Sequence, residues 1–507
     1  MSMKVILVRF NRLIIIGLLL AMVTLIAGAQ EKWTPQGCRR GTPRPQSMLL
    51  SRGDGVDGMP GGDFYHGERH QLTVLVAFND RSFVGDEAAT LEQWNKIFNG
   101  ENGLEAPFKG SVHDYFYDQS YGDFNLIFDL HYVQVGGDAI KYASNQANDE
   151  NSRFLIEDIV GTLKTRDIDW GQYDWNGDGY INQLLIIYAG HGKHDSKGDD
   201  QIWPHQWWMS EHLKDVEEEV YCDPIPVSSG GKDYLVDCYC ALNELTKNDD
   251  YGSFSTICHE YSHCFGFPDF YNNIGNTVVG EWDLMDRGNL TDDGYLPPGY
   301  SAHERWLMGW LKPIELNSTS SIVNMPALAD EGRAYLIRND GYENEYYIVE
   351  NRQQKGWDKG LPGSGILIFH VDYEPSIWTS TWERVNTEFL RRYEIFKANN
   401  LKDLREGWGY PYQENNSLTN TSTPVAKLNH ENKDGEKLMS KPITNMAVKG
   451  GLASFDFTVT TTGISKLTTD AGAEQLLYRF GMIDIMRDAK GNIRKVIRNH
   501  SFAASER

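Results

Sequence analysis

The stretch "CHEYSHCFGFPD", residues 258–269, decides what fold and site this chain is expected to have. His259 and His263 are four residues apart, so on a helix their rings project from one face and can share a metal ion. Glu260 lies about 100° further around such a helix, beside the open position of the metal. The stretch therefore predicts a metal-binding helix over residues 254–265, against the alternative of two hydrogen-bonded core histidines.

The third ligand is expected just after this helix. A zinc site in a hydrolase needs three protein ligands and leaves the fourth position for water. Gly266 can end the helix in the left-handed conformation, and Pro268 fixes the returning chain, so the Asp269 carboxylate could reach the same ion. The predicted ligands are thus the two histidines and Asp269, with Glu260 as general base. Glu281, or another downstream glutamate, is the alternative third ligand.

A second candidate site is the stretch "DWNGDGYIN", residues 174–182. Its oxygen ligands for calcium would be Asp174, Asn176, Asp178, the Tyr180 carbonyl and Asn182. An EF-hand would have glutamate at loop position 12, where this chain has leucine. The stretch therefore predicts either a calcium loop of another type or a tight turn rich in Asp and Asn.

The extended pattern H-E-x-x-H-x-x-G-x-x-D resembles the zinc motif of metzincin-type peptidases, with aspartate in place of their usual third histidine. The following "VGEWDLMDRGN", residues 279–289, resembles their Met-turn, which would place Met285 beneath the zinc ligands. Arg287 departs from the tyrosine that those peptidases often carry two residues after the methionine. Which side chain stabilises the oxyanion therefore stays open.

The chain resembles, more specifically, the immune inhibitor A family of secreted bacterial zinc metallopeptidases over roughly residues 70–375. The blocks that carry the resemblance, in the family's order, are "SVHDYFYDQSYGDF" (111–124), "YDWNGDGYINQLLIIYAGHG" (173–192), "IWPH" (202–205), "HEYSHCFGFPDFY" (259–271), "GYSAHERWLMGWL" (299–311) and "YYIVENRQQKGWDKGLPGSGILIFHVD" (346–372).

The expected fold class is α+β: a metzincin-like zinc peptidase domain with a mixed sheet and an active-site helix, then a mostly β C-terminal domain. Hydrophobic periodicity predicts a helix in 90–100 and strands at 183–190, 345–352, 365–372 and 453–460. Residues 375–430 are polar and predict long loops. The expected divisions are a signal peptide (1–29), a candidate pro-segment (30–64), the catalytic domain (65–311), the β-rich domain (312–461) and a small element of unknown role (462–507).

The first 29 residues have the pattern of an export signal. Lys4, Arg9 and Arg12 precede an apolar run at 13–26, and Ala-Gly-Ala at 27–29 suits cleavage. The run is short for a membrane anchor, and no later stretch is long and apolar enough to span a bilayer. We expect a secreted or extracellular protein, or a periplasmic one, without stable membrane insertion after cleavage.

The Gly/Pro-rich segment 30–64 is suited to lie extended across a cleft and block it. Either the Cys38 thiolate or a carboxylate of Asp54, Asp57 or Asp63 could occupy the fourth position of the zinc. The alternative is a flexible leader without an inhibitory role.

The six cysteines are too few for a disulfide scaffold, although export permits one or two bridges. The pairing expected from sequence is Cys222 with Cys238 or Cys240. Cys258 and Cys264 flank the histidines and are expected to be core thiols.

These observations predict a secreted zinc-dependent endopeptidase that hydrolyses peptide bonds of extracellular proteins, with protein or peptide substrates and a monomeric state. The formal charge of −23 argues against nucleic acid as a partner. One alternative is a zinc peptidase restricted to glycoproteins, which would not cleave plain casein. Another is an exported adhesion or carbohydrate-binding protein, whose function would survive Glu260→Ala.

Overall fold

The computed structural model describes residues 65–100, 104–143, 151–196, 198, 200–215, 220–252, 254–379 and 384–459, and three later strands. Residue contacts group the chain into two compact units, Met1–Phe457 and Thr458–Arg507. The predicted export signal and pro-segment lie outside the described residues and stay predictions.

The first unit is built on a five-stranded sheet in the order β2-β1-β4-β10-β5. Strands β1 (Gly67–Ala77), β2 (Phe124–Gln134), β4 (Leu184–His191) and β10 (Cys238–Leu245) are parallel, and β5 (His205–Trp208) is an antiparallel edge strand. Strand β4 lies one residue from its predicted position. The sheet is mixed, as the sequence indicated.

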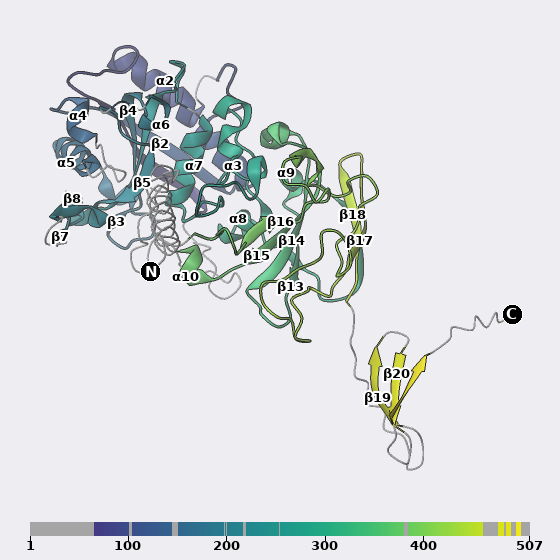
Figure 1. The fold of residues 1–507 in the computed structure, drawn as a ribbon. Coiled ribbons are helices and arrows are strands. Elements are labelled where there is room, and N and C mark those ends of the chain that lie inside the picture. The colour runs from purple at the N-terminus through teal and green to yellow at the C-terminus, as the bar shows by residue number, and fades with distance from the viewer. Residues whose placement is uncertain are drawn as a thin grey trace, which may run out of the picture. The chain divides into compact units, whose positions relative to one another are not determined.

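Both faces of this sheet are covered, because successive strand residues point to opposite sides. In β1, Leu75 and Ala77 belong to one hydrophobic cluster, whereas Val74 and Val76 belong to another. Helices α2 (Glu87–Asn99), α3 (Val112–Gln119) and α7 (Phe254–Cys264) pack in the first cluster, and α5 (Ser152–Leu163) packs in the second. Figure 1 shows α3 and α7 on one side of the strands and α5 on the other. The helix with the two histidines is thus fixed against the sheet.

Two further sheets make up the later part of the first unit. One has the order β11-β13-β14-β15-β16, and the other β12-β18-β17. Strands β14 (Glu345–Arg352) and β15 (Gly365–Asp372) coincide with their predictions and are buried at every position. The others are β11 (Ile314–Glu315), β12 (Ser320–Met325), β13 (Tyr335–Arg338), β16 (Tyr393–Ile395), β17 (Ile443–Lys449) and β18 (Leu452–Phe457).

The predicted division at residue 311 is not a break in packing. One hydrophobic cluster contains Met285 and Trp306 from before it together with Ile348 and Leu367 from after it. The first compact unit accordingly continues to Phe457. An independent C-terminal β domain is therefore not evident, and the predicted domain ranges remain predictions.

The region 375–430 is mostly loop, as predicted, but parts of it are buried in the hydrophobic core. Trp378, Tyr393 and Trp408 are buried and belong to the same hydrophobic cluster as helix α7. Polar composition predicts the loops but not their burial, because a few large aromatic side chains are enough to anchor a loop in a core.

The remaining elements are short. The helices are α4 (Ala139–Tyr142), α6 (Lys193–Ser196), α8 (Ala302–Leu307), α9 (Leu328–Glu331) and α10 (Pro375–Trp378). The strands are β3 (Tyr180–Ile181), β6 (Leu213–Asp215), β7 (Val220–Tyr221), β8 (Ile225–Ser229) and β9 (Lys232–Val236). Among the described residues no helix is both long and apolar enough to cross a bilayer.

In the second unit the described residues form one antiparallel sheet, β19-β20-β21. Its strands are β19 (Gln475–Phe480), β20 (Ile483–Arg487) and β21 (Ile493–Ile497).

The predicted pairing of Cys222 with Cys238 or Cys240 is wrong, because all three are free thiols in the structure. Cys238 and Cys240 lie instead in the buried strand β10, where both thiols interact electrostatically with that of Cys264. Burial raises the pKa of the Cys238 and Cys258 thiols well above the ordinary value. Cys258 is a core thiol as predicted, and Cys264 packs against the same cluster.

Candidate metal centre

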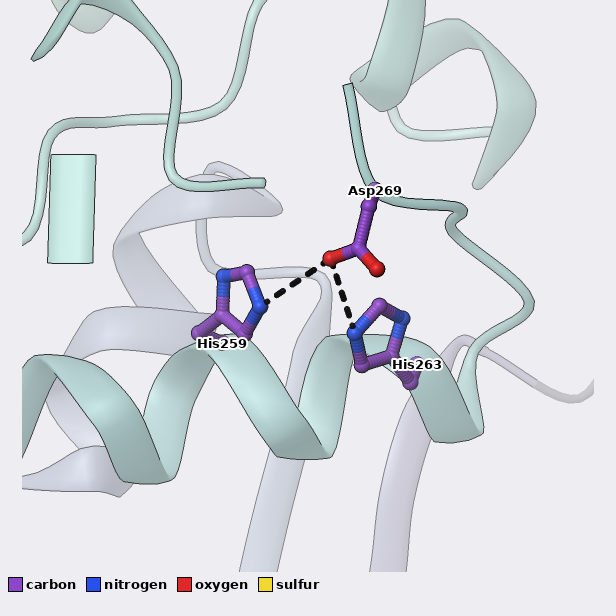
Figure 2. A group of neighbouring side chains, drawn as sticks. All are labelled: His259, His263 and Asp269. Atoms are coloured by element: carbon purple, nitrogen blue, oxygen red, sulfur yellow. Dashed lines mark ion pairs between the residues drawn. The ribbon is translucent and has the colours of Figure 1, made fainter. Parts of the chain in front are cut away.

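The two histidines of α7 and the aspartate after it meet at one point. Asp269 Oδ1 lies 3.4 Å from His259 Nε2 and 3.4 Å from His263 Nε2. The three possible ligand atoms all lie within 4.8 Å of one another, and all three side chains are buried. Figure 2 shows the two rings rising from one face of the helix toward the same carboxylate oxygen.

Each imidazole is oriented by a backbone carbonyl on its other nitrogen. His259 Nδ1 is 2.8 Å from the Leu284 carbonyl, and His263 Nδ1 is 2.7 Å from the Phe267 carbonyl. A carbonyl can only accept, so each Nδ1 carries a hydrogen, and each ring in its neutral form directs its Nε2 lone pair into the site. This is the support that metal-binding histidines use to fix tautomer and ring orientation.

The oxygens of Asp269 have different roles. Oδ2 accepts a hydrogen bond from the Tyr271 hydroxyl at 2.7 Å and one from Arg384 Nη1. Oδ1 has no hydrogen-bond partner, and neither has His263 Nε2. Buried polar atoms without a partner are rare in native proteins, so two of them facing each other fit a bound cation.

The electrostatics of the site also suit a cation. Burial disfavours a charged His259, but the carboxylates of Asp269 and Glu260 outweigh burial and raise its pKa to about 9. Burial likewise disfavours the Asp269 carboxylate, but His263 and Arg384 hold its pKa well below the ordinary value. The site thus stabilises positive charge between the rings and the carboxylate, which a divalent metal can supply in place of a proton.

Local structure brings Asp269 back to the helix. Gly266 has a φ of 98°, which a side chain would disfavour, and its N–H donates to the His263 carbonyl at 2.9 Å. The predicted glycine stop is therefore confirmed. The chain then reverses, so that Asp269 faces the helix from which it has just emerged.

The segment around Met285 supports both halves of the site. The Leu284 carbonyl holds His259, and the Met285 carbonyl accepts from the Phe270 N–H at 2.8 Å, next to Asp269. Met285 itself is fully buried. The turn predicted to lie against the ligands thus contacts the helix and the ligand loop through its backbone.

Glu281, the alternative third ligand, lies elsewhere. Its carboxylate forms an ion pair with Arg405. Among the described residues the group of His259, His263 and Asp269 is the one cluster of three His, Cys, Asp or Glu side chains close enough to share a metal. The geometry therefore favours Asp269 over Glu281.

Glu260 is buried and lines a cleft of about 720 Å³. His194, Trp203 and Tyr295 also line it. Arg287, at the position where the resemblance would have a tyrosine, is exposed. The cleft gives a substrate access to Glu260, and its volume lies in the ordinary range for ligand sites.

The predicted calcium loop is organised around Asp174. Asp174 Oδ1 accepts the N–H groups of Gly177 at 2.9 Å and of Asp178 at 3.1 Å, and Oδ2 accepts that of Gly179 at 3.0 Å. This is the pattern of a turn closed by its own aspartate.

The other predicted oxygen ligands are used in a similar way. Asp178 Oδ1 accepts from the Tyr180 N–H at 2.9 Å, and Asn182 Oδ1 accepts from the Trp175 N–H at 2.6 Å. Asn176 Nδ2 donates to Asp178 Oδ2 at 3.1 Å. The structure brings these residues together but supports the turn that was the alternative; calcium binding here stays a prediction.

Sequence reasoning missed Arg384 and the role of Tyr271, which together hold Asp269. Tyr271 ends the motif block 259–271, only two residues after Asp269, so its position in the sequence was a signal that it could contact this ligand. Arg384 is 115 residues from Asp269 and lies in a segment without any motif, so no sequence signal indicated it.

This constellation has the geometry expected of a metal site on an H-E-x-x-H helix. Residues 83–306 match the family "Immune inhibitor A peptidase M6, catalytic domain", the family that the motifs of this region resemble. A relative described as "Immune inhibitor A", from Bacillus thuringiensis subsp. alesti, is 28% identical over 255 residues. That similarity covers 45% of this chain and 34% of the relative, so the chain spans about a third of that relative's length.

Proposed function

We propose that this protein is an exported, zinc-dependent endopeptidase whose metal ligands are His259, His263 and Asp269. The observation that carries the proposal is the convergence of two carbonyl-anchored imidazoles and one carboxylate oxygen on a buried point. The match of residues 83–306 to the M6 peptidase family supports the reaction class.

Zinc suits this donor set. Two imidazole nitrogens and one carboxylate oxygen are common zinc ligands, and a catalytic site keeps a fourth position for water or substrate. When bound, zinc supplies Lewis-acid polarisation of the scissile carbonyl and of a water molecule.

Glu260 is the proposed general base. It follows His259 on α7, is buried, and faces the cleft. Its carboxylate takes a proton from the attacking water and returns that proton to the amine that leaves. No serine or cysteine nucleophile is needed. We expect the substrates to be extracellular proteins, because residues 1–29 have the pattern of an export signal.

The test is to measure zinc content and casein cleavage of the full chain and of Glu260→Ala. We expect one zinc per chain in both proteins, inhibition of the wild type by a chelator with recovery on zinc addition, and a loss of about 10²–10⁴-fold in cleavage rate for Glu260→Ala. Glu281→Ala is the matched control, because Glu281 pairs with Arg405.

Each rival function predicts a different result. Cleavage of glycosylated proteins without cleavage of casein would indicate the glycoprotein-restricted peptidase. A protein without bound zinc whose function survives Glu260→Ala would indicate an adhesion or carbohydrate-binding role. Full proteolysis in Glu260→Ala with zinc still bound would overturn the assignment of the base.

A further inference from the structure

We propose that Arg384, which lies 78 residues beyond the end of the family match at 306, is a positioning residue that holds Asp269 in its metal-binding orientation. The inference rests on the proposed zinc site, and it assigns a role in that site to a segment without a recognisable motif.

One oxygen of the Asp269 carboxylate accepts hydrogen bonds from neighbouring side chains, and the other faces the two histidines. Arg384 Nη1 and the Tyr271 hydroxyl both donate to Oδ2. Oδ1 is left directed at His259 Nε2 and His263 Nε2, at 3.4 Å from each. A carboxylate held at one oxygen by two donors cannot turn about its Cβ–Cγ bond, so the second oxygen stays in the site.

Arg384 and Tyr271 also support each other. The guanidinium carbon of Arg384 lies 5.3 Å from the centre of the Tyr271 ring. A cation at this distance from an aromatic ring is attracted to it. Tyr271 therefore helps to place the arginine that bonds the same carboxylate oxygen.

The backbone next to Arg384 is fastened to the loop that carries Asp269. Asn386, which is fully buried, donates from Nδ2 to the Phe270 carbonyl at 2.8 Å. The Asn273 N–H donates to the Asn386 carbonyl at 3.1 Å, and the Glu388 N–H donates to Asn273 Oδ1 at 2.9 Å. These bonds connect residues 386–388 to residues 270–273 and bring Arg384 to Asp269.

The segment that follows Arg384 also packs against the loop that carries Asp269. The Phe270 and Tyr393 rings are 4.0 Å apart between centres, and both residues are fully buried. Asn386 donates to the Tyr393 carbonyl as well, at 2.8 Å. The third-ligand loop is thus clamped by a segment of the β-rich part of the unit.

Two effects of Arg384 on zinc have opposite signs. Its positive charge repels a cation, whereas its hydrogen bond fixes the ligand. Loss of outer partners of metal ligands usually costs about 10–100-fold in metal affinity or activity. We therefore expect positioning to outweigh repulsion.

The experiment compares zinc dissociation constants of the full chain, by competition with a chromophoric chelator, for wild type, Arg384→Ala, Arg384→Gln and Arg384→Lys. We expect Arg384→Ala to weaken zinc binding about tenfold. Arg384→Lys and Arg384→Gln, which keep a donor, should recover part of the loss. Arg392→Ala is the matched control, since Arg392 pairs with Asp372 at 3.1 Å in the same segment and should leave zinc affinity unchanged.

Thermal melting in excess chelator separates positioning from general damage to the fold. Equal melting temperatures for wild type and Arg384→Ala, with weaker zinc binding in the variant, support the inference. Unchanged or tighter zinc binding in Arg384→Ala overturns it. If Arg384→Ala does not fold, the same two measurements, zinc affinity and melting temperature, are made on Arg384→Gln and Tyr271→Phe. Weaker zinc binding at an unchanged melting temperature again supports the inference, and unchanged or tighter zinc binding overturns it. A wild type without zinc would instead refute the proposed function.

Discussion

The candidate zinc site and the loop 174–182 look alike in sequence and differ in how they use their lone pairs. Both gather short polar side chains within about ten residues. In the zinc site, backbone carbonyls hold the far nitrogens of the rings, and Asp269 Oδ1 and His263 Nε2 have no hydrogen-bond partner. In the loop, both oxygens of Asp174 accept backbone N–H groups of the loop itself.

The difference shows why ligand-type residues at ligand-type spacing are only half of a metal site. An oxygen already bonded to the backbone stabilises the local turn whether or not an ion is present. A buried lone pair without a partner costs free energy until something binds it. Whether each lone pair already accepts a hydrogen bond therefore distinguishes a site that needs an ion from a turn that is stable without one.

The largest effect expected from this comparison concerns Asp269. Because removing it leaves two protein ligands, Asp269→Ala should weaken zinc binding more than about a hundredfold, more than loss of an outer partner usually does. Glu281→Ala should leave the zinc dissociation constant within about threefold, since Glu281 pairs with Arg405. Competition titration with a chelator measures both; the reverse result would make Glu281 the third ligand.

A smaller effect is expected for Asp174, and it should be independent of any ion. Asp174→Ala leaves the N–H groups of Gly177 and Gly179 without this acceptor, and the Asp178 N–H keeps only its bond to Asn176 Oδ1 at 3.3 Å. The change should lower the free energy of unfolding by about 1–2 kcal/mol, even with excess chelator present. Asp174→Asn keeps one acceptor oxygen and should lose less. Urea denaturation measures the change. An unaltered urea midpoint in Asp174→Ala would mean that these hydrogen bonds do not support the turn.

The smallest effect is expected from calcium. If the loop binds it with the dissociation constant of an extracellular module, about 10⁻⁴–10⁻³ M, then 1 mM calcium stabilises the folded protein by about 0.4–1.4 kcal/mol. The rise in melting temperature should disappear in Asp178→Ala. Calcium that leaves the wild-type melting curve in place would show that the loop is a turn only.

Sequence patterns were sufficient where a signal repeats along a single element. The helix over 254–264 follows from its apolar spacing, and β14 and β15 follow from the short apolar runs at 346–349 and 366–369. His259 and His263 could be placed on one face because four residues make about one helical turn. These contacts are local, so the sequence contains their geometry.

Contacts between distant segments could not be predicted in the same way. The choice between Asp269 and Glu281 depends on where the chain returns, and Arg405, which holds Glu281, is far along the sequence. The wrong cysteine pairing has the same origin, because spacing does not reveal that Cys238 and Cys240 lie in a buried strand beside Cys264. Arg384 reaches Asp269 across 115 residues. No periodicity encodes such a distance.

The clamp on the ligand loop also has a consequence for timing during synthesis. Arg384 and Asn386 lie about three quarters of the way along the 507-residue chain, whereas both histidines are made much earlier. A nascent chain that has just completed residues 259–269 has all three ligands but lacks the hydrogen bonds that order the third. The ribosome must add more than a hundred further residues before that loop is held. Completion of the site is thereby postponed until the chain has grown past Asn386.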